Sequence, residues 1–160
     1  MKLGIIADSH DHLPNLRKAL KIFKEKGCEY ILHCGDFISP FVFRVFKEFG
    51  IPVYGVFGNN DGEWLYLLKM AEGIGEIKKG PIELELEGKR IALMHEPTYI
   101  SVLRSSSHFD LIAYGHTHQP QLELTPPLLI NPGECCGYLS GKATVVFCDL
   151  KEMNAELIVL

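Results

Sequence analysis

Residues 2–10 of the chain read KLGIIADSH, a short apolar run that ends abruptly in polar residues. A run of this kind, here Lys2–Ala7, is typical of a buried β-strand. Two more such runs follow at Tyr30–His33 and Val53–Phe57, and a segment with helical periodicity separates each pair. Strands that alternate with helices favour parallel pairing through crossover helices, so the first third of the chain predicts a β-α-β-α-β unit.

Both helices have recognisable start or stop residues. The first is expected to end at Gly27 and the second at Gly50. Ser39 is expected to cap the second helix, with Pro40 at its first position. The inward faces are predicted to carry Leu16, Ala19, Leu20 and Phe23 in the first helix and Val42, Val45, Phe46 and Phe49 in the second.

The second half of the chain has a different pattern. Apolar residues alternate with glutamates over Ile82–Leu86, which indicates a strand with one solvated face. Gly88-Lys89 is expected to form a two-residue turn into Ile91–Met94. The other strands expected are Leu111–Tyr114, Leu128–Ile130, Thr144–Cys148 and Ala155–Val159, the last two as a hairpin. We therefore predict a mixed α/β (α+β) protein, a two-sheet β-sandwich flanked by helices, in a single domain spanning residues 1–160.

Composition narrows the classes of protein to which the chain can belong. With 160 residues, 47% hydrophobic and a net charge of −4, it is an ordinary globular chain rather than a disordered one. No apolar run approaches the roughly 20 residues that cross a bilayer, so no membrane partner is expected. The lack of a basic block argues against binding nucleic acid, small nucleotide diesters excepted. Five cysteines without a disulfide-rich density indicate a reducing, cytoplasmic location.

Residues with metal-binding side chains follow the predicted strands. The carboxyl ends of strands are where open α/β sheets build their ligand sites. Residues two apart on an extended chain point to one side, so Asp8 and His10 are expected to converge, and His116 and His118 likewise. The complete set has two carboxylates, four imidazoles and one amide: Asp8, His10, Asp36, Asn59, His95, His116 and His118.

The chemistry of this set predicts metal binding. Oxygen and nitrogen donors without a thiolate suit divalent manganese, iron, cobalt, nickel or zinc. Seven residues exceed the needs of one tetrahedral site, so two metals that share a ligand are the simplest interpretation. Two divalent ions outweigh the charge of two aspartates, so the site would attract an anionic phosphate even in an acidic protein.

Five motifs occur in order along the chain: Asp8-Ser9-His10, Gly35-Asp36, Gly58-Asn59-Asn60-Asp61, His95 and Gly115-His116-Thr117-His118. The ordered set resembles the calcineurin-like metallophosphoesterases. Asn131-Pro132-Gly133, which comes later, resembles a motif of the small YfcE-like phosphodiesterases within that superfamily. The resemblance implies the metallophosphoesterase fold and a hydrolase that cleaves small or activated phosphodiesters. The nucleophile would be a hydroxide that bridges two divalent metal ions.

The resemblance also implies a role for each residue. One metal would be held by Asp8, His10, Asp36 and His118, and the other by Asp36, Asn59, His95 and His116, with Asp36 bridging. Asp36, Asn59 and His95 are expected to be catalytic as well. Manganese is the metal expected first, with nickel, iron, cobalt or zinc as alternatives. The expected partner is a small-molecule phosphodiester, and a homo-oligomer stays open because the family includes dimers and tetramers.

Three positions depart from the family pattern, and one of them is Glu96-Pro97, which follows His95 where the family usually has glycine. The other two bear on the substrate. Many members carry a histidine where this chain has Asn60, and an amide cannot act as a general acid, so substrates with poor leaving groups should be disadvantaged. Glu134 follows the Asn-Pro-Gly motif where serine is common, which predicts a negative charge near the substrate that would disfavour highly charged monoesters.

Plainer interpretations apply to other polar residues. His33 is expected to be a hydrogen-bonded core residue, His12 to cap a helix or line the site, and Asp61 to orient its neighbours. Cys135 and Cys136 are expected to be simple thiols, since adjacent cysteines rarely form a relaxed disulfide. The alternative to an enzyme is a scaffold or interaction protein of the same fold, like the retromer subunit of the superfamily. That subunit has lost several ligand positions, whereas all seven occur here, so the enzyme is favoured.

Overall fold

The first sheet of the protein contains strands from both ends of the chain. In a computed structural model that describes residues 1–160, its strands are β1 (Lys2–Ile6), β2 (Tyr30–His33), β3 (Val53–Val56), β4 (Gly75–Lys78), β10 (Thr144–Asp149) and β11 (Asn154–Val159). Their order across the sheet is β11-β10-β1-β2-β3-β4. The strands β1 to β4 are parallel neighbours, which confirms the unit expected for the first third of the chain.

The second sheet is formed by the middle of the chain. Its strands are β5 (Ile82–Leu86), β6 (Lys89–Leu93), β7 (Leu111–Ala113), β8 (Pro120–Glu123) and β9 (Leu128–Pro132). They lie in the order β5-β6-β7-β9-β8, with β6, β7 and β9 parallel and both edge strands antiparallel to their neighbours. Parallel strands in both sheets leave several carboxyl ends free to build one site.

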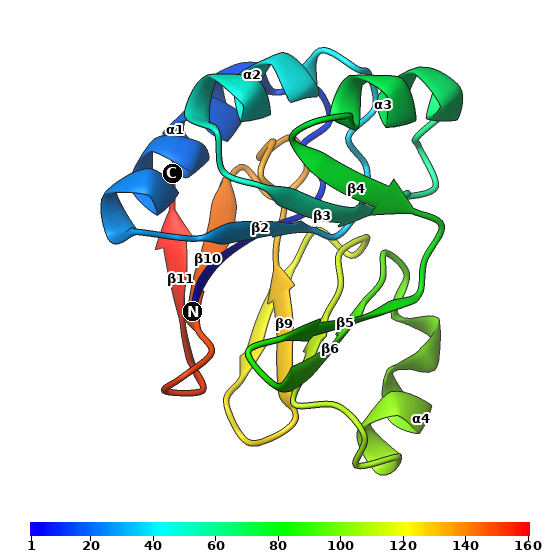
Figure 1. Cartoon of the computed structure of the whole chain (residues 1–160), viewed down its shortest axis with the longest axis vertical. Coiled ribbons are helices and arrows are strands. Elements are labelled where there is room, and N and C mark those ends of the chain that lie inside the picture. The colour runs from blue at the N-terminus through cyan, green and yellow to red at the C-terminus, as the bar shows by residue number, and fades with distance from the viewer.

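The helices flank the two sheets. They are α1 (Leu13–Lys26), α2 (Val42–Phe49), α3 (Trp64–Ala71) and α4 (Ile100–Ser105), preceded by the 3-10 turn η1 (Pro97–Tyr99). Figure 1 shows α1, α2 and α3 together over the first sheet, whereas α4 lies beside the second sheet. None of the helices has the length and apolar character that a bilayer-spanning helix needs.

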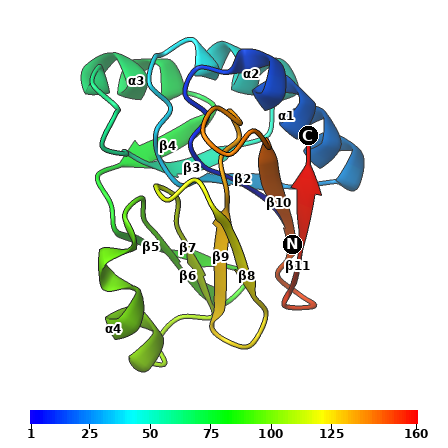
Figure 2. The ribbon, with the colours of Figure 1, turned by 180° about the vertical axis from the view of Figure 1, so that it is seen from behind.

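Apolar side chains fill three layers between these elements. The largest cluster lies between α1–α3 and the first sheet, and another joins the two sheets, with Leu3 and Ile5 of β1 beside Ile91 and Leu111. A smaller cluster joins the second sheet to Ile100 and neighbouring residues around α4, which lies on the outer side of that sheet in Figure 2. The layers confirm the predicted fold class of two packed sheets flanked by helices.

A glycine in β1 permits close packing of the first helix. A Cβ atom at Gly4 would lie 2.4 Å from Cδ2 of Phe23, so the absence of a side chain lets the Phe23 ring lie against the strand backbone. The predicted end of α1 at Gly27 is confirmed, since Gly27 adopts the left-handed conformation (φ 75°) that closes helices.

Two predictions, for the cap of the second helix and for the turn of the hairpin, are wrong by one or two residues. The helix α2 begins at Val42 without a side-chain cap, because the hydroxyl of Ser39 donates instead to Oδ1 of Asp11 at 2.7 Å. The hairpin turn between β5 and β6 is Glu87-Gly88 rather than Gly88-Lys89. Both turn residues have positive φ (49° and 71°), as a two-residue turn of this handedness requires.

Candidate metal centre

Seven polar side chains meet at one rim of the two sheets. The strand β1 is followed by Asp8 and His10, β2 by Asp36, β3 by Asn59, β6 by His95, and β7 by His116 and His118. The first sheet therefore contributes the carboxylates, the amide and one imidazole, and the second sheet contributes three imidazoles. All seven residues that the sequence selected are brought together.

The backbone at this rim is bent into unusual conformations. Positive φ angles occur at five of the seven residues: Asp8 (50°), His10 (39°), Asp36 (59°), His116 (70°) and His118 (59°). Residues other than glycine rarely adopt this left-handed conformation, which costs free energy unless the surroundings hold it. Such conformations gather at functional sites, so the backbone points to function independently of the side chains.

Glycines next to the site make room for its side chains. A Cβ atom at Gly35 would lie 2.6 Å from Nδ1 of His95, and one at Gly58 would lie 2.2 Å from Oδ1 of Asp36. Any other residue at either position would displace a predicted ligand. Glycine is therefore required at these two motif positions for a steric reason, which the spacing of the motifs does not reveal.

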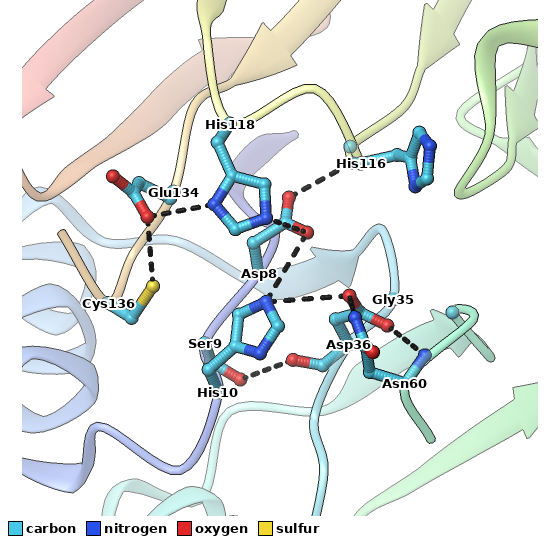
Figure 3. Close-up of polar contacts among 12 residues, drawn as sticks. Asp8, Ser9, His10, Gly35, Asp36, Asn60, His116, His118, Glu134 and Cys136 are labelled. Carbon is cyan, nitrogen blue, oxygen red and sulfur yellow. Dashed lines mark hydrogen bonds and ion pairs between the residues drawn. The ribbon is translucent and has the colours of Figure 1, made fainter. Parts of the chain in front are cut away.

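The first cluster of donor atoms surrounds Asp8 (Figure 3). Nε2 of His10 lies 3.4 Å from Oδ2 of Asp36 and 3.9 Å from Oδ1 of Asp8. Nε2 of His118 lies 3.4 Å from the same Asp8 oxygen. Two of these atoms, Oδ1 of Asp8 and Nε2 of His10, are buried and have no hydrogen-bond partner. Buried polar atoms without a partner are costly, and a cation bound between these two atoms would satisfy both.

The second cluster surrounds the amide oxygen of Asn59. This oxygen lies 2.8 Å from Nε2 of His95 and 2.9 Å from Nδ1 of His116. The two imidazole nitrogens are 3.3 Å apart, and Nε2 of His95 is 3.6 Å from Oδ2 of Asp36. Oδ2 of Asp36 is therefore close to both clusters, which is the position of a bridging ligand.

Both clusters fit a divalent cation. Ligand atoms about 2.1 Å from a tetrahedral metal lie about 3.4 Å from one another, close to the separations in the first cluster. In the second cluster, two imidazole nitrogens lie close to each other and to one amide oxygen. This arrangement of donor atoms is expected where a cation binds between them. Asp8, Asp36 and His95 also offer three ligand atoms within 4.8 Å of one another.

Burial shifts the pKa values of three of these groups away from their charged forms. Desolvation by burial raises the pKa of Asp8 to about 7, against the opposing effect of His118. Burial likewise lowers the pKa of His10 and of His95, although Asp36 opposes it in both cases. Neutral imidazoles are the form that binds metal, and a bound cation would restore the ionised form of the carboxylate.

Neighbouring groups fix the directions of the donors. Nδ1 of His95 lies 2.8 Å from the carbonyl oxygen of Cys34, so a proton on Nδ1 donates to it and leaves the lone pair of Nε2 for a metal. Asp61 accepts hydrogen bonds from the backbone N–H groups of Asp36, Ile38 and Gly58, at 3.1, 2.7 and 2.8 Å. Asp61 thereby joins the loops after β2 and β3, which is the orienting role predicted for it.

Glu134 does not face the substrate side, and that prediction is wrong. Its side chain is buried, and Oε2 accepts a hydrogen bond from Nδ1 of His118 at 2.8 Å (Figure 3). Burial alone would raise the pKa of this carboxyl, but hydrogen bonds from Ser140, His118 and Leu139 outweigh burial and hold the pKa well below its usual range. A carboxylate behind a histidine fixes the imidazole tautomer and increases its basicity as a ligand.

The thiol of Cys136 is close to the first cluster but is not in a ligand's protonation state. Its Sγ donates to Oε2 of Glu134 at 3.1 Å, and it lies within 4.8 Å of the ligand atoms of His10 and His118. Burial raises its pKa to about 12, so the thiol is protonated near neutral pH. All five cysteines are free, as expected for Cys135 and Cys136.

Two other histidines stand apart from the clusters, as predicted for His33, while His12 takes the helix-capping role that was one of its alternatives. His33 is fully buried, stacks on Phe37 with ring centroids 3.7 Å apart, and contacts Oγ of Ser9 at 3.1 Å. His12 caps α1, because its Nδ1 accepts from the backbone N–H of Asn15 at 3.2 Å.

Asn60 contacts the carboxylate of Asp36. Its Nδ2 donates to Oδ2 of Asp36 at 2.7 Å and its backbone N–H donates to Oδ1 at 2.9 Å (Figure 3). The amide at this position therefore orients Asp36. Proton donation to a leaving group would need an acidic side chain here, which the chain lacks.

A family model for the calcineurin-like phosphoesterase superfamily domain matches residues 1–153. The chain belongs to the calcineurin-like phosphoesterase superfamily. The resemblance drawn from the five motifs is thus confirmed. Membership makes the chain a phosphoesterase, which is a hydrolase, and implies divalent metal ions.

Individual relatives of this phosphoesterase match along its whole length. Phosphodiesterase MJ0936 of Methanocaldococcus jannaschii is 39% identical over 165 residues, with 100% of this chain and 99% of the relative covered. A solved structure described as a novel archaeal phosphodiesterase is 38% identical and superposes with a TM-score of 0.94 over 100% of both chains.

More distant structures share the fold alone. YfcE, a phosphoesterase from E. coli, is 21% identical with a TM-score of 0.71 over 99% of this chain and 98% of its own. Vps29 of Entamoeba histolytica in complex with zinc is 15% identical with a TM-score of 0.67 over 99% of both chains.

Proposed function

We propose that this phosphoesterase is a metal-dependent phosphodiesterase that hydrolyses small or activated phosphodiesters at a two-metal centre. The observation that carries the proposal is the pair of donor clusters that approach Oδ2 of Asp36, the first of which contains two buried atoms without partners. The diesterase reaction is supported by the name of the relative that is 39% identical over its full length.

The proposed ligands are those the motifs selected. One ion would be held by Asp8, His10, Asp36 and His118, and the other by Asp36, Asn59, His95 and His116. We expect manganese first, with nickel, iron, cobalt or zinc as alternatives, since the oxygen and nitrogen donors suit them all. When bound, such ions activate a water molecule for attack on phosphorus and neutralise charge on the phosphoryl oxygens.

The chain's own residues position this chemistry. Asp36, Asn59 and His95 are the proposed catalytic residues, because they lie where the two clusters meet. Asn59 and His95 also line an open cavity. His116 is the most exposed of the four histidines in the set, which supports a position facing the substrate. Because the amide of Asn60 cannot donate a proton to the departing oxygen, diesters with acidic leaving groups are the expected substrates.

The experiment that tests the proposal is hydrolysis of bis(p-nitrophenyl) phosphate by metal-stripped protein before and after Mn²⁺ is added. Activity is expected only with metal, and Asp36→Asn and His118→Ala should lower it by at least about a hundredfold. Asp110→Asn and His108→Ala are matched controls, because both residues lie in surface ion pairs with Lys89 and Glu83. The controls should keep the wild-type rate.

Unchanged rates in Asp36→Asn or His118→Ala would contradict the assigned centre. If correctly folded, metal-loaded wild type hydrolyses no diester at all, the scaffold alternative is favoured and the search turns to protein partners.

A further inference from the structure

A cavity of about 390 Å³ opens beside the second donor cluster. Its lining residues come from the loop after β3, the start of α3, the β4–β5 connection and the segment from β6 to η1. Two of them, Asn59 and His95, also belong to the metal centre. A phosphate bound at the centre would therefore direct one of its ester groups into this cavity.

One wall of the cavity contains a rigid aromatic ring from the start of α3. Trp64 stacks on Phe57 with the centroids 4.6 Å apart and the planes 9° from parallel. Its indole N–H also donates to the backbone oxygen of Asp61, the residue that joins the loops after β2 and β3. The ring is thus held on one face and at its edge, yet 40% of Trp64 is exposed.

The remaining walls combine apolar and polar groups. Tyr99, from η1, is 50% exposed, and Met94 supplies a buried apolar surface. Lys79, Glu96 and Thr98 are exposed on the cavity's border and offer hydrogen bonds and charges of both signs. An aromatic surface with a few polar groups is the usual lining of a small-molecule site.

We propose that this cavity binds a planar aromatic ester group of the substrate, of nucleobase size, stacked against Trp64. The proposal rests on the proposed diesterase function and names the class of diester that the centre accepts. A flat ring gains stacking on an indole that is already ordered, whereas an alkyl group gains only contact area. The volume is near the lower end of the range for ligand sites, about 300–1,000 Å³, and suits one nucleoside rather than an oligonucleotide.

The chain contains a single tryptophan, so its fluorescence reports on this cavity directly. The metal-loaded protein is titrated with adenosine 5′-monophosphate, phenyl phosphate and ribose 5-phosphate, which share a phosphate and differ in the ring. Adenosine monophosphate is expected to quench the emission saturably, and ribose 5-phosphate to leave it unchanged. Tighter binding of the nucleotide than of phenyl phosphate would identify a nucleobase as the occupant, and equal binding a simple aryl group.

Competitive inhibition of bis(p-nitrophenyl) phosphate hydrolysis gives a second measurement. Wild type should bind adenosine monophosphate about tenfold or more tightly than ribose 5-phosphate, the usual scale of one base stacked on an aromatic side chain. Trp64→Leu should reduce this ratio to about one. Tyr99→Leu keeps the fluorescent ring and changes an exposed residue with little risk to folding, and it should weaken the quenching affinity severalfold.

Tyr66→Leu is the matched control, because Tyr66 is an exposed aromatic residue on the same helix as Trp64 but does not line the cavity. It should keep the wild-type ratio. Equal inhibition by the two phosphates in wild type, or a preference that survives in Trp64→Leu, would overturn the proposal. Quenching measures binding and requires no turnover. The cavity proposal can therefore fail or succeed independently of the diesterase function, which the hydrolysis assay tests.

Discussion

The carboxylate of Glu134 is buried behind His118 and determines where that imidazole points. Four hydrogen-bond donors contact it, which are Nδ1 of His118, Sγ of Cys136 and the backbone N–H groups of Leu139 and Ser140. Glu134→Gln keeps the size of the side chain but removes the charge, so the Nδ1 proton of His118 is held less firmly.

We expect Glu134→Gln to weaken Mn²⁺ binding by about tenfold to a hundredfold, the usual effect of losing a carboxylate behind a metal-binding histidine. Isothermal titration calorimetry of the metal-stripped protein measures this without turnover. Glu25→Gln, on the exposed side of α1, is the control and should bind as wild type does. Equal affinity in Glu134→Gln would show that Glu134 only fills space.

His33 makes the metal-free protein sensitive to acid. Burial lowers the pKa of His33 well below its usual value. Its Nδ1 accepts the backbone N–H of Gly35 at 3.2 Å, so a second proton on the ring would break that bond. Below about pH 6.5 the unfolded chain binds a proton that the folded chain does not, so stability is present above this pH and is lost as pH falls.

The free energy of unfolding should therefore fall by on the order of 1 kcal/mol through His33 between pH 7 and pH 5.5. Urea unfolding of chelated wild type and of His33→Asn at both pH values isolates this contribution. The variant is expected to lose less stability on acidification than wild type does, whatever its stability at pH 7. An identical loss in both proteins would exclude His33 as a source of acid sensitivity.

The packing of helix α1 against strand β1 depends on a single glycine. The strand β1 and the helix α1 touch where Gly4 meets Phe23, and a Cβ atom there would lie 2.4 Å from the ring. Because the ring is fully buried, it has no free space into which to move.

Gly4→Ala should lower the free energy of unfolding by about 1–3 kcal/mol, the usual cost of overpacking a core. Urea denaturation measures it. Gly62→Ala is the control, since nothing lies within 4 Å of a Cβ atom at Gly62 and its φ is not positive. If both variants lose the same stability, the packing of α1 on β1 is looser than the contact indicates.

The elements that the sequence did not predict have weak local signals. The helix α3 reads WLYLLKMA, which is apolar on nearly every side, and Leu65 is 86% exposed, so no helical period marks a buried face. The short strands β4 and β8 read GEIK and PQLE and lie at sheet edges. These strands form because they pair with β3 and β9, and a four-residue sequence does not predict such pairing.

Across the whole molecule, one physical rule predicts most of the site. Strand-end polar residues in parallel sheets meet at one rim, and the structure brings all seven together. The roles of Glu134 and Trp64 could not be predicted in this way. Glu134 contacts His118 only because the loop after β9 folds back toward the site. Trp64 lines a cavity that forms only where segments distant in the sequence come together.

Because both sheets supply ligands to the proposed centre, metal should stabilise the fold as a whole. Mn²⁺ at a hundred times its dissociation constant would add about 2.7 kcal/mol. In a chain of this length that corresponds to a rise in Tm of about 5–10 °C relative to chelated protein. Scanning calorimetry with and without Mn²⁺ measures it. Asp36→Asn should show little of the shift, and a full shift in that variant would place the metal elsewhere.

The turn Glu87-Gly88 stands at the amino end of β6, and His95 follows its carboxyl end. Five residues of extended strand, about 3.3 Å each, separate this turn from the chemistry. Glu87 and Gly88 are both exposed to solvent, and they connect the paired strands β5 and β6. An affinity tag, a dye or a linker to a solid support inserted at this turn should therefore leave catalysis intact, which makes it the natural handle for immobilising the enzyme.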